Sequence, residues 1–215
     1  MKKKEIIHIF LAILVLTIVI SFSKLIEQNY NDLGIYFLFA LGIISINICA
    51  KKLMARTLDS DVTHEIWRFS RFGFKPDQHF KKGISAGVIF PLVFTAFSLG
   101  MLKVMTLLTY NTKILKRRAA KRFGLYSFTE MTDWHTSLIG GAGILATLLI
   151  AFLGYWLPLP AELGDIIFKT ASYYAFFNLV PFSKLDGSQI FFGSRVLWFT
   201  LSIITLIFTG YSLSF

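Results

Sequence analysis

Apolar blocks separated by short polar segments dominate the chain. The blocks cover residues 6–22, 33–50, 135–157, 166–181 and 195–213. An apolar block of about 18 residues with few charges is typical of a helix that crosses a bilayer. The pattern therefore predicts an all-α, polytopic membrane protein with about five full spans.

A further apolar block at residues 83–110 contains Pro91, Gly100 and Lys103, which suit an interrupted backbone. The three lysines that follow Met1 place the N-terminus in the cytoplasm, because basic residues gather on that side. If residues 83–110 crossed once, the next loop would lie outside.

That loop, at residues 111–134, carries Lys113, Lys116, Arg117, Arg118, Lys121 and Arg122. Such a basic loop belongs in the cytoplasm. We therefore expect residues 83–110 to enter the membrane and return as a hairpin or re-entrant segment. The alternative is a single tilted span that breaks the charge rule.

Composition excludes an ordinary soluble domain. The 215 residues are 55% hydrophobic and only 16% charged, whereas a soluble domain has about 25% charged residues. The net charge of +10 comes from Lys and Arg that flank apolar blocks, which indicates contact with anionic lipid headgroups and no role in nucleic-acid binding. The single cysteine, Cys49, allows no intrachain disulfide. We expect a multi-pass protein of the cell membrane, with residues 1–50 as two N-terminal spans and residues 51–215 as a membrane core.

A polar motif closes the block at residues 166–181. It consists of Asn178-Leu179-Val180-Pro181, four further residues, and Asp186-Gly187. Pro181 leaves backbone carbonyls free, and Gly187 allows a turn with positive φ. A carboxylate such as that of Asp186 is costly near a membrane and is usually functional there. The alternative is an ordinary helix end with a solvated aspartate.

This motif resembles the C-terminal signature of the site-2 protease family, which consists of intramembrane zinc metalloproteases. The resemblance covers roughly residues 64–198 and implies a core of three or more helices with active-site segments at the cytoplasmic side. It also implies that Asp186 is a zinc ligand and that Asn178 and Pro181 shape the substrate site. The run Ala142-Gly143-Ile144-Leu145-Ala146-Thr147 resembles the family's Ala-Gly-Pro-x-x-Asn. A small pair in a span is also the commonest way for helices to pack closely.

The family's other hallmark, His-Glu-x-x-His on a helix, is matched in part by His64-Glu65-Ile66-Trp67-Arg68. The resemblance implies that His64 is a zinc ligand and Glu65 the general base. Arg68 stands where the second histidine belongs, and a guanidinium has no lone pair to give to a metal. We expect Arg68 to pair with Glu65 or Asp186. The alternative for this segment is a solvated amphipathic helix.

His135 is the candidate replacement for the missing ligand. It begins a span on the side of the membrane expected for His64 and Asp186. Two imidazoles and a carboxylate, with a fourth position for water, would suit catalytic zinc. A histidine beside Trp134 also fits an aromatic belt at the membrane interface.

Three functions remain open at this point. An active member of the family would hydrolyse a peptide bond of a transmembrane protein substrate, with water activated by zinc and by Glu65. Arg68 favours a non-catalytic relative, in which the same core binds a partner helix in the membrane. The third function is a small transporter with broken helices near Pro91 and Pro181, and the lack of an internal repeat counts against it.

Overall fold

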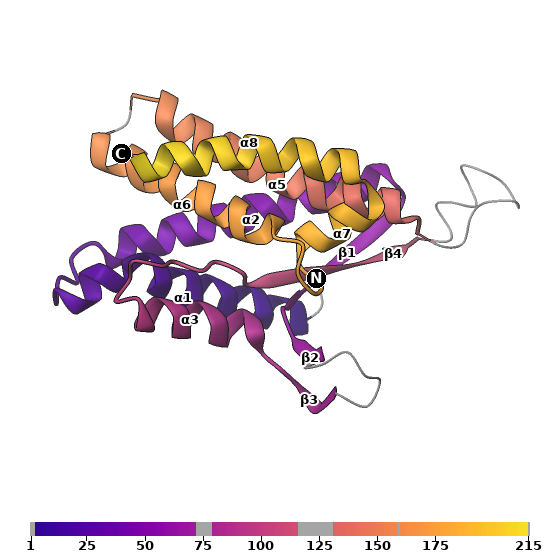
Figure 1. Cartoon of the computed structure of the whole chain (residues 1–215), viewed down its shortest axis with the longest axis horizontal. Helices are drawn as coiled ribbons and strands as arrows, with labels where there is room; N and C mark the ends of the chain where they lie inside the picture. The colour runs from indigo at the N-terminus through magenta and orange to yellow at the C-terminus, as the bar shows by residue number, and fades with distance from the viewer. Residues whose placement is uncertain (1–2, 72–78, 116–130, 159, 215) are drawn as a thin grey trace, which may run out of the picture.

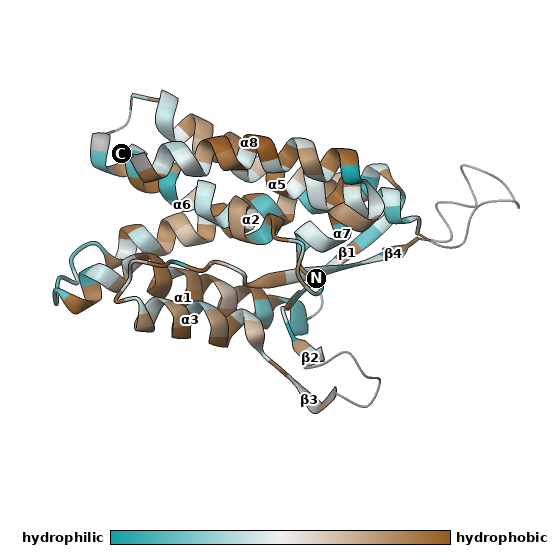
Figure 2. Cartoon of the chain, viewed as in Figure 1, coloured by the Kyte–Doolittle hydropathy of each residue, from teal (hydrophilic) through white to brown (hydrophobic). Residues whose placement is uncertain are grey.

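Long apolar helices make up most of the computed structural model, which describes residues 3–71, 79–115, 131–158 and 160–214 (Figure 1). Among these residues, four helices are long and apolar enough to cross a membrane. They are α1 (Lys3–Ile26), α2 (Leu33–Thr57), α5 (Asp133–Trp156) and α8 (Arg195–Ser214). Figure 2 shows hydrophobic residues along most of their length. The predicted all-α class fits, and four of the expected spans are helices of the required kind.

The expected span at residues 166–181 belongs to α6 (Ala161–Leu179), which is 19 residues long but carries Glu162, Asp165 and Lys169 in its first half. A short helix, α7 (Asp186–Gly193), follows it and leads into α8. Helix α5 packs against α2, α6 and α7, while α1 packs against α2 and α3. Helix α5 is therefore the element that joins the N-terminal helices to the C-terminal ones.

The block at residues 83–110 leaves one end of the molecule and comes back to it. Helix α3 (Ala86–Phe97) ends before Gly100, whose φ of +85° turns the chain, and the chain then returns to β4 (Leu108–Ile114). The two ends of the block meet at Trp67, whose N–H donates to Leu107 O at 3.0 Å and whose carbonyl accepts from the Gly87 N–H at 2.9 Å. Figure 1 shows α3 and the returning segment side by side along α1. The path is that of a hairpin.

Two short antiparallel strand pairs accompany the helices. Strand β1 (Ser60–Ile66) pairs with β4, and β2 (Phe69–Arg71) pairs with β3 (His79–Ile84). In β1 the buried and exposed side chains alternate, with Val62, His64 and Ile66 buried. These strands replace much of the polar stretch that follows α2.

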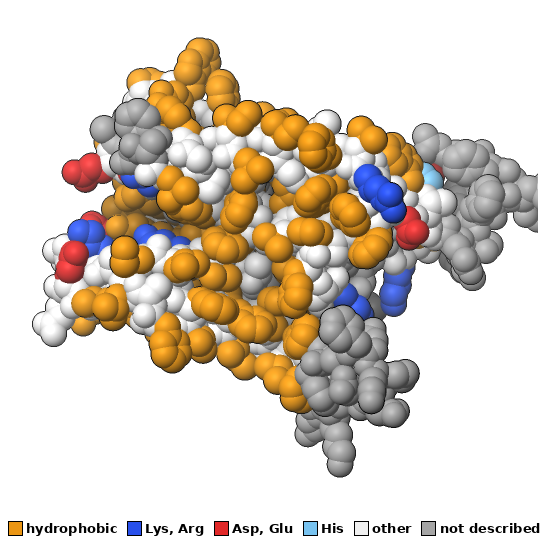
Figure 3. All heavy atoms as spheres, in the orientation of Figure 1, with side chains coloured by type: hydrophobic (Ala, Val, Ile, Leu, Met, Phe, Trp, Pro, Cys, Tyr) orange, Lys and Arg blue, Asp and Glu red, His pale blue; other side chains and the backbone are white. Residues whose placement is uncertain are grey.

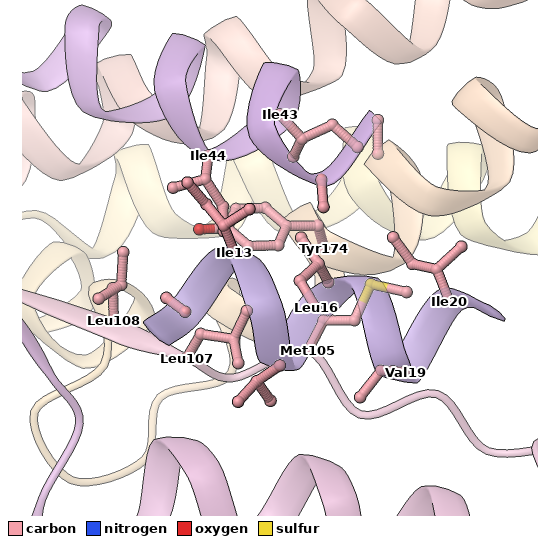
Figure 4. Close-up of a cluster of buried hydrophobic side chains, with 14 of the residues drawn as sticks. Ile13, Leu16, Val19, Ile20, Ile43, Ile44, Met105, Leu107, Leu108 and Tyr174 are labelled. Atoms are coloured by element: carbon pink, nitrogen blue, oxygen red, sulfur yellow. The ribbon is translucent and has the colours of Figure 1, made fainter. Parts of the chain in front are cut away.

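The main apolar core lies between α1, α2 and the returning segment (Figure 4). Leu16 and Ile44 contribute from the two N-terminal helices, Met105 and Leu107 come from the returning segment, and Tyr174 reaches in from α6. This core fixes the returning segment against the helices. Residue 50, the expected domain boundary, lies inside α2.

The elements that carry the sequence motifs gather at one end of the molecule. The start of α1, strand β1, the start of α5 and helix α7 all lie there, whereas the C-terminus and the tip of the 83–110 hairpin lie at the other end (Figure 1). The candidate residues in β1, α5 and α7 are therefore neighbours in the fold, although they are far apart in the sequence.

Candidate functional site

The aspartate of the C-terminal motif is engaged in a buried ion pair. Asp186 opens α7, and its Oδ2 accepts a hydrogen bond from Nζ of Lys51 on α2. Both side chains are 2% exposed. Burial raises the pKa of Asp186, and the ammonium of Lys51 opposes that shift. The charge that faces this carboxylate is an ammonium from the same chain.

The backbone of the motif explains how Asp186 reaches this position. Helix α6 ends at Leu179, and the chain turns at Ser183, which has a φ of +54°. A Cβ at Gly187 would overlap the carbonyl of Leu179. Gly187 was expected to supply a positive φ, and this was wrong. Gly187 instead permits the close approach of α7 to the end of α6, and Ser183 takes the left-handed conformation.

Asn178 and Pro181 have different surroundings. Asn178 is buried, and its Nδ2 donates to Tyr174 O at 2.7 Å and to Met105 O at 3.3 Å. The second bond ties α6 to the returning segment, so Asn178 positions these two elements. Pro181 is exposed and lines a small apolar cleft between the end of α6 and α8.

Small residues on α5 make room for Lys51. A Cβ at Gly143 would overlap the side chain of Lys51, and one at Gly140 would overlap the hydroxyl of Tyr110. The ammonium of Lys51 lies 4.9 Å from the centre of the Tyr110 ring. The run that contains Gly143 therefore acts in close packing, which was one of the two alternatives for it.

Asn47 lies one turn before Lys51 and also faces α5. Its Nδ2 donates to Gly143 O at 3.0 Å and to Thr147 Oγ1 at 3.1 Å. Residues four apart on a helix share one face. Asn47 and Lys51 thus present an amide and an ammonium on the face of α2 that meets α5 and Asp186.

The His64-Glu65 pair lies on a strand, which corrects the helix expected for it. Successive side chains of a strand point to opposite faces, so His64 is buried while Glu65 is exposed. Glu65 therefore points away from His64, to the opposite face of the strand. His64 is paired with Tyr110 across the β1–β4 ladder.

A second charged group lies beside His64. Glu5, on the first turn of α1, accepts from Lys52 Nζ at 2.7 Å, and its Oε1 is 3.4 Å from Nδ1 of His64. Burial lowers the pKa of His64 to about 3, and the charge of Lys51 acts in the same direction. His64 is therefore neutral at pH 7, and its Nε2 has no hydrogen-bond partner among the described residues.

His135 and Arg68 stay outside this cluster. Nδ1 of His135 is 2.6 Å from Thr132 Oγ1, which also accepts from the His135 N–H and caps α5. Trp134 beside it is 50% exposed, as an aromatic belt requires. Arg68 is exposed, and the expected pairing with Asp186 is made by Lys51 instead.

Asp186 and His64 thus both lie near the ammonium of Lys51, but the two do not form part of a set of three metal ligands in the described part of the chain. Within the described ranges, no group of three or more His, Cys, Asp or Glu side chains could hold a metal ion. His135 is engaged at the N-terminus of α5 and Glu65 faces outward. Zinc, Glu65 as base, and His64, His135 and Asp186 as ligands remain expectations of the sequence resemblance.

The residue that the sequence analysis missed is Lys51. The apolar block of the sequence ends at residue 50, which places Lys51 in the polar segment that follows. Helix α2 continues to Thr57, so Lys51 lies on helical backbone and not in a loop. The available signal was Asn47, which falls on the same helical face and faces the glycines of α5.

Comparison of this chain with protein-family models, with curated proteins and with solved structures finds no match.

Proposed function

We propose that this protein is a multi-pass membrane protein with a site-2-protease-like core that has lost its catalytic zinc and binds a membrane-embedded segment of a partner protein. The observation that carries the proposal is the buried pair of Lys51 and Asp186. The residue that the resemblance marks as a metal ligand has an ammonium as its counterion.

The proposed membrane placement follows from the arrangement of the ends. The start of α1, strand β1, the start of α5 and α7 lie together, and the segments beside them carry most of the basic residues. Placing this end in the cytoplasm satisfies the positive-inside rule. Helices α1, α2, α5, α6 and α8 then cross the membrane, and residues 83–110 enter from the cytoplasm and return.

A divalent cation does not fit the site as the side chains lie. A protonated amine has no lone pair for a metal, and a positive charge within a few ångströms repels a cation strongly in a medium of low dielectric. Zinc in catalytic sites has three protein ligands. Here Asp186 binds Lys51, His64 is directed at Glu5, and the face of α2 offers Asn47 in place of an imidazole.

The proposed partner segment would bind beside the C-terminal motif. The cleft at Pro181 lies between α6 and α8, is lined mostly by apolar residues together with Ser202 and Thr205, and has a volume of about 170 Å³. Two of its lining side chains, Val180 and Leu206, are 36% and 56% exposed. In a membrane, such a surface packs against another helix through close contact rather than through loss of water.

The test is to build the missing ligands and to measure zinc. In the Asn47→His/Lys51→His variant, two imidazoles four residues apart would share the face of α2 that meets Asp186. We expect the detergent-purified wild type to lack zinc that resists mild chelation and the variant to hold about one zinc per chain. The matched control adds Asp186→Asn, which removes the carboxylate and should weaken the new site.

A wild type that purifies with near-stoichiometric zinc, lost in Asp186→Ala and in His135→Ala, would overturn the proposal. It would show that Lys51 gives way to a metal and that an active protease with a rearranged site is the better account.

A further inference from the structure

An apolar groove with two lysines lies at the end of the molecule opposite to Asp186. Its walls are the returning segment at residues 100–105, the middle of α6 and the last two turns of α8. Its volume is about 680 Å³. Figure 3 shows a hollow between the two halves of the molecule at this end, with Lys and Arg side chains inside it.

Charge in the groove is of one sign. Lys103, on the returning segment, and Lys169, on α6, both line it, and no acidic residue of the described ranges does. Lys169 is 2.9 Å from Asp165, which lies outside the lining, whereas Lys103 has no acidic partner among the described residues. The two ammonium groups thus share one groove. A half-buried ammonium in apolar surroundings is costly unless an anion pairs with it.

The rest of the lining is suited to a hydrocarbon chain. Side chains such as Met101, Met105, Tyr173 and Phe177 form the walls, and a Cβ at Gly210 on α8 would meet no atom within 4 Å. From Lys169 to Phe177 the groove follows α6 for about 12 Å, at 1.5 Å per residue. It therefore combines a cationic group with a long apolar channel beside it.

We propose that this groove binds an anionic phospholipid, with its phosphate at Lys103 and Lys169 and one acyl chain along α6 and α8. The charge of the groove favours this lipid over an apolar helix of a partner protein. Lys103 and Lys169 both line the groove, and the lipid supplies the negative charge that these two ammonium groups lack.

The experiment uses the full chain, purified in a non-ionic detergent and depleted of lipid. Palmitoyl-oleoyl phosphatidylglycerol and phosphatidylcholine, which share their acyl chains and differ in net charge, are titrated separately, and bound lipid is counted by native mass spectrometry. We expect the wild type to prefer phosphatidylglycerol. Lys103→Gln should lower that affinity about 10-fold, as for the loss of one charge-assisted hydrogen bond. The affinity for phosphatidylcholine should fall less, because the choline cation of that lipid already offsets the charge of its phosphate.

Lys24→Gln is the matched control, because Lys24 lies in the last turn of α1 and does not line the groove. It should change neither affinity. Lys169→Gln should act in the same direction as Lys103→Gln and decides the question if one variant fails to fold. Gly210→Leu fills the channel and should weaken binding of both lipids.

Equal affinity for the two lipids in the wild type, or an equal loss in Lys24→Gln and Lys103→Gln, would refute the lipid site. A bound peptide or second copy of the chain, found in place of lipid and lost in Gly210→Leu, would assign the groove to a protein partner and refute it as well. None of these outcomes depends on zinc.

Discussion

Lys51 and Asp186 neutralise each other's charge inside the folded protein. A buried ion pair is often no more stable than apolar residues of the same volume, but a buried charge without its partner is strongly destabilising. The two residues come from α2 and α7, and both are 2% exposed. Each therefore holds the other element in place, and the pair makes the position of α7 depend on α2.

A double-mutant cycle measures this dependence. We expect Lys51→Met and Asp186→Asn to lower the free energy of unfolding by about 3–5 kcal/mol each, because each leaves one charge buried alone. The double variant should be less destabilised than the sum of the single ones, and near the wild type. Chemical unfolding in detergent gives the three values. Additive losses would mean that the two groups do not interact in the folded protein.

Acid should destabilise the protein through His64. Burial first, and then the charge of Lys51, lowers the pKa of His64 from 6.5 to about 3, while Glu5 opposes the shift. The unfolded chain takes up this proton near pH 6.5 and the folded protein only near pH 3. The stability that neutral His64 provides is complete above pH 6.5 and is lost as the pH falls toward 3, at ~1.4 kcal/mol per pH unit at most.

The measurement compares unfolding of the wild type and of His64→Gln between pH 7 and 5, where few carboxylates change charge. The wild type should lose stability over this range, and the variant should lose less. His135→Gln serves as the control, because His135 is only half-buried, at the start of α5. Identical pH profiles of wild type and His64→Gln would disprove the neutral, buried state of His64.

At the scale of elements, glycines set the distances between backbones. Gly87 lets α3 approach the carbonyl of Leu107, and Gly187 lets α7 approach the carbonyl of Leu179. Both contacts are to backbone, which cannot rotate away as a side chain can. The hairpin at residues 83–110 and the turn before α7 therefore require glycine at these two positions, because a larger side chain would overlap the backbone.

Gly187→Ala tests this dependence. The added methyl group would overlap the Leu179 carbonyl, so we expect a loss of about 1–3 kcal/mol or more. Gly42→Ala on α2 is the matched control, because its Cβ would meet no atom within 4 Å. Alanine there should be neutral or raise stability by about 0.5–1 kcal/mol, since glycine is a poor helix former. Thermal unfolding in detergent distinguishes the two variants, and equal effects would show that α7 does not need the close approach.

The helices could be predicted from the sequence more reliably than the candidate site. The apolar blocks at α1, α2, α5 and α8 are long enough to fix the element type by themselves. Residues 83–110 follow a hairpin path, whereas the membrane placement expected from the loop charges stays a prediction. His64 was misplaced on a helix because a motif match carries no information on the backbone conformation. The alternation of buried and exposed side chains from Ser60 to Ile66 cannot be recognised from hydropathy, because some of the buried side chains are polar.

Lys51 was missed for a different reason. A lysine at the end of an apolar block normally lies at the membrane surface, and its burial depends on Asp186, whose approach to α2 cannot be read from local sequence. Contacts of this kind are set by the packing of α5 and α7 and not by the residues next to Lys51. The charge partner of a buried group is therefore the part of such a site that sequence patterns describe least.

For the whole molecule, the arrangement of the ends predicts sidedness. In a Cys49→Ala background, we expect single cysteines at Asp61 and Asn111 to react with an impermeant thiol reagent from the cytoplasmic side, because β1 and β4 are paired. A cysteine at Asn29, in the link between α1 and α2, should react from the opposite side. All three positions are exposed in the fold.

Labelling of Asp61→Cys and Asn111→Cys from opposite sides would disprove the re-entrant placement of residues 83–110 and leave a single crossing. The Asn29→Cys protein controls for leakage of the reagent, since its label should appear only in the complementary preparation.

The separation of Lys51 and Asp186 in the sequence affects the biogenesis of the protein. The two lie 135 residues apart, and at ribosomal speed the later one is made on the order of ten seconds after the earlier one. During that time α2 carries an ammonium without its partner, which disfavours burial of this end of α2 by at most about 3 kcal/mol, the cost at the centre of a membrane helix. Nascent chains arrested before residue 186 should hold α2 loosely at the translocon, and its firm integration should await the synthesis of α7. We therefore expect α2 to complete its packing only after α7 has been synthesised.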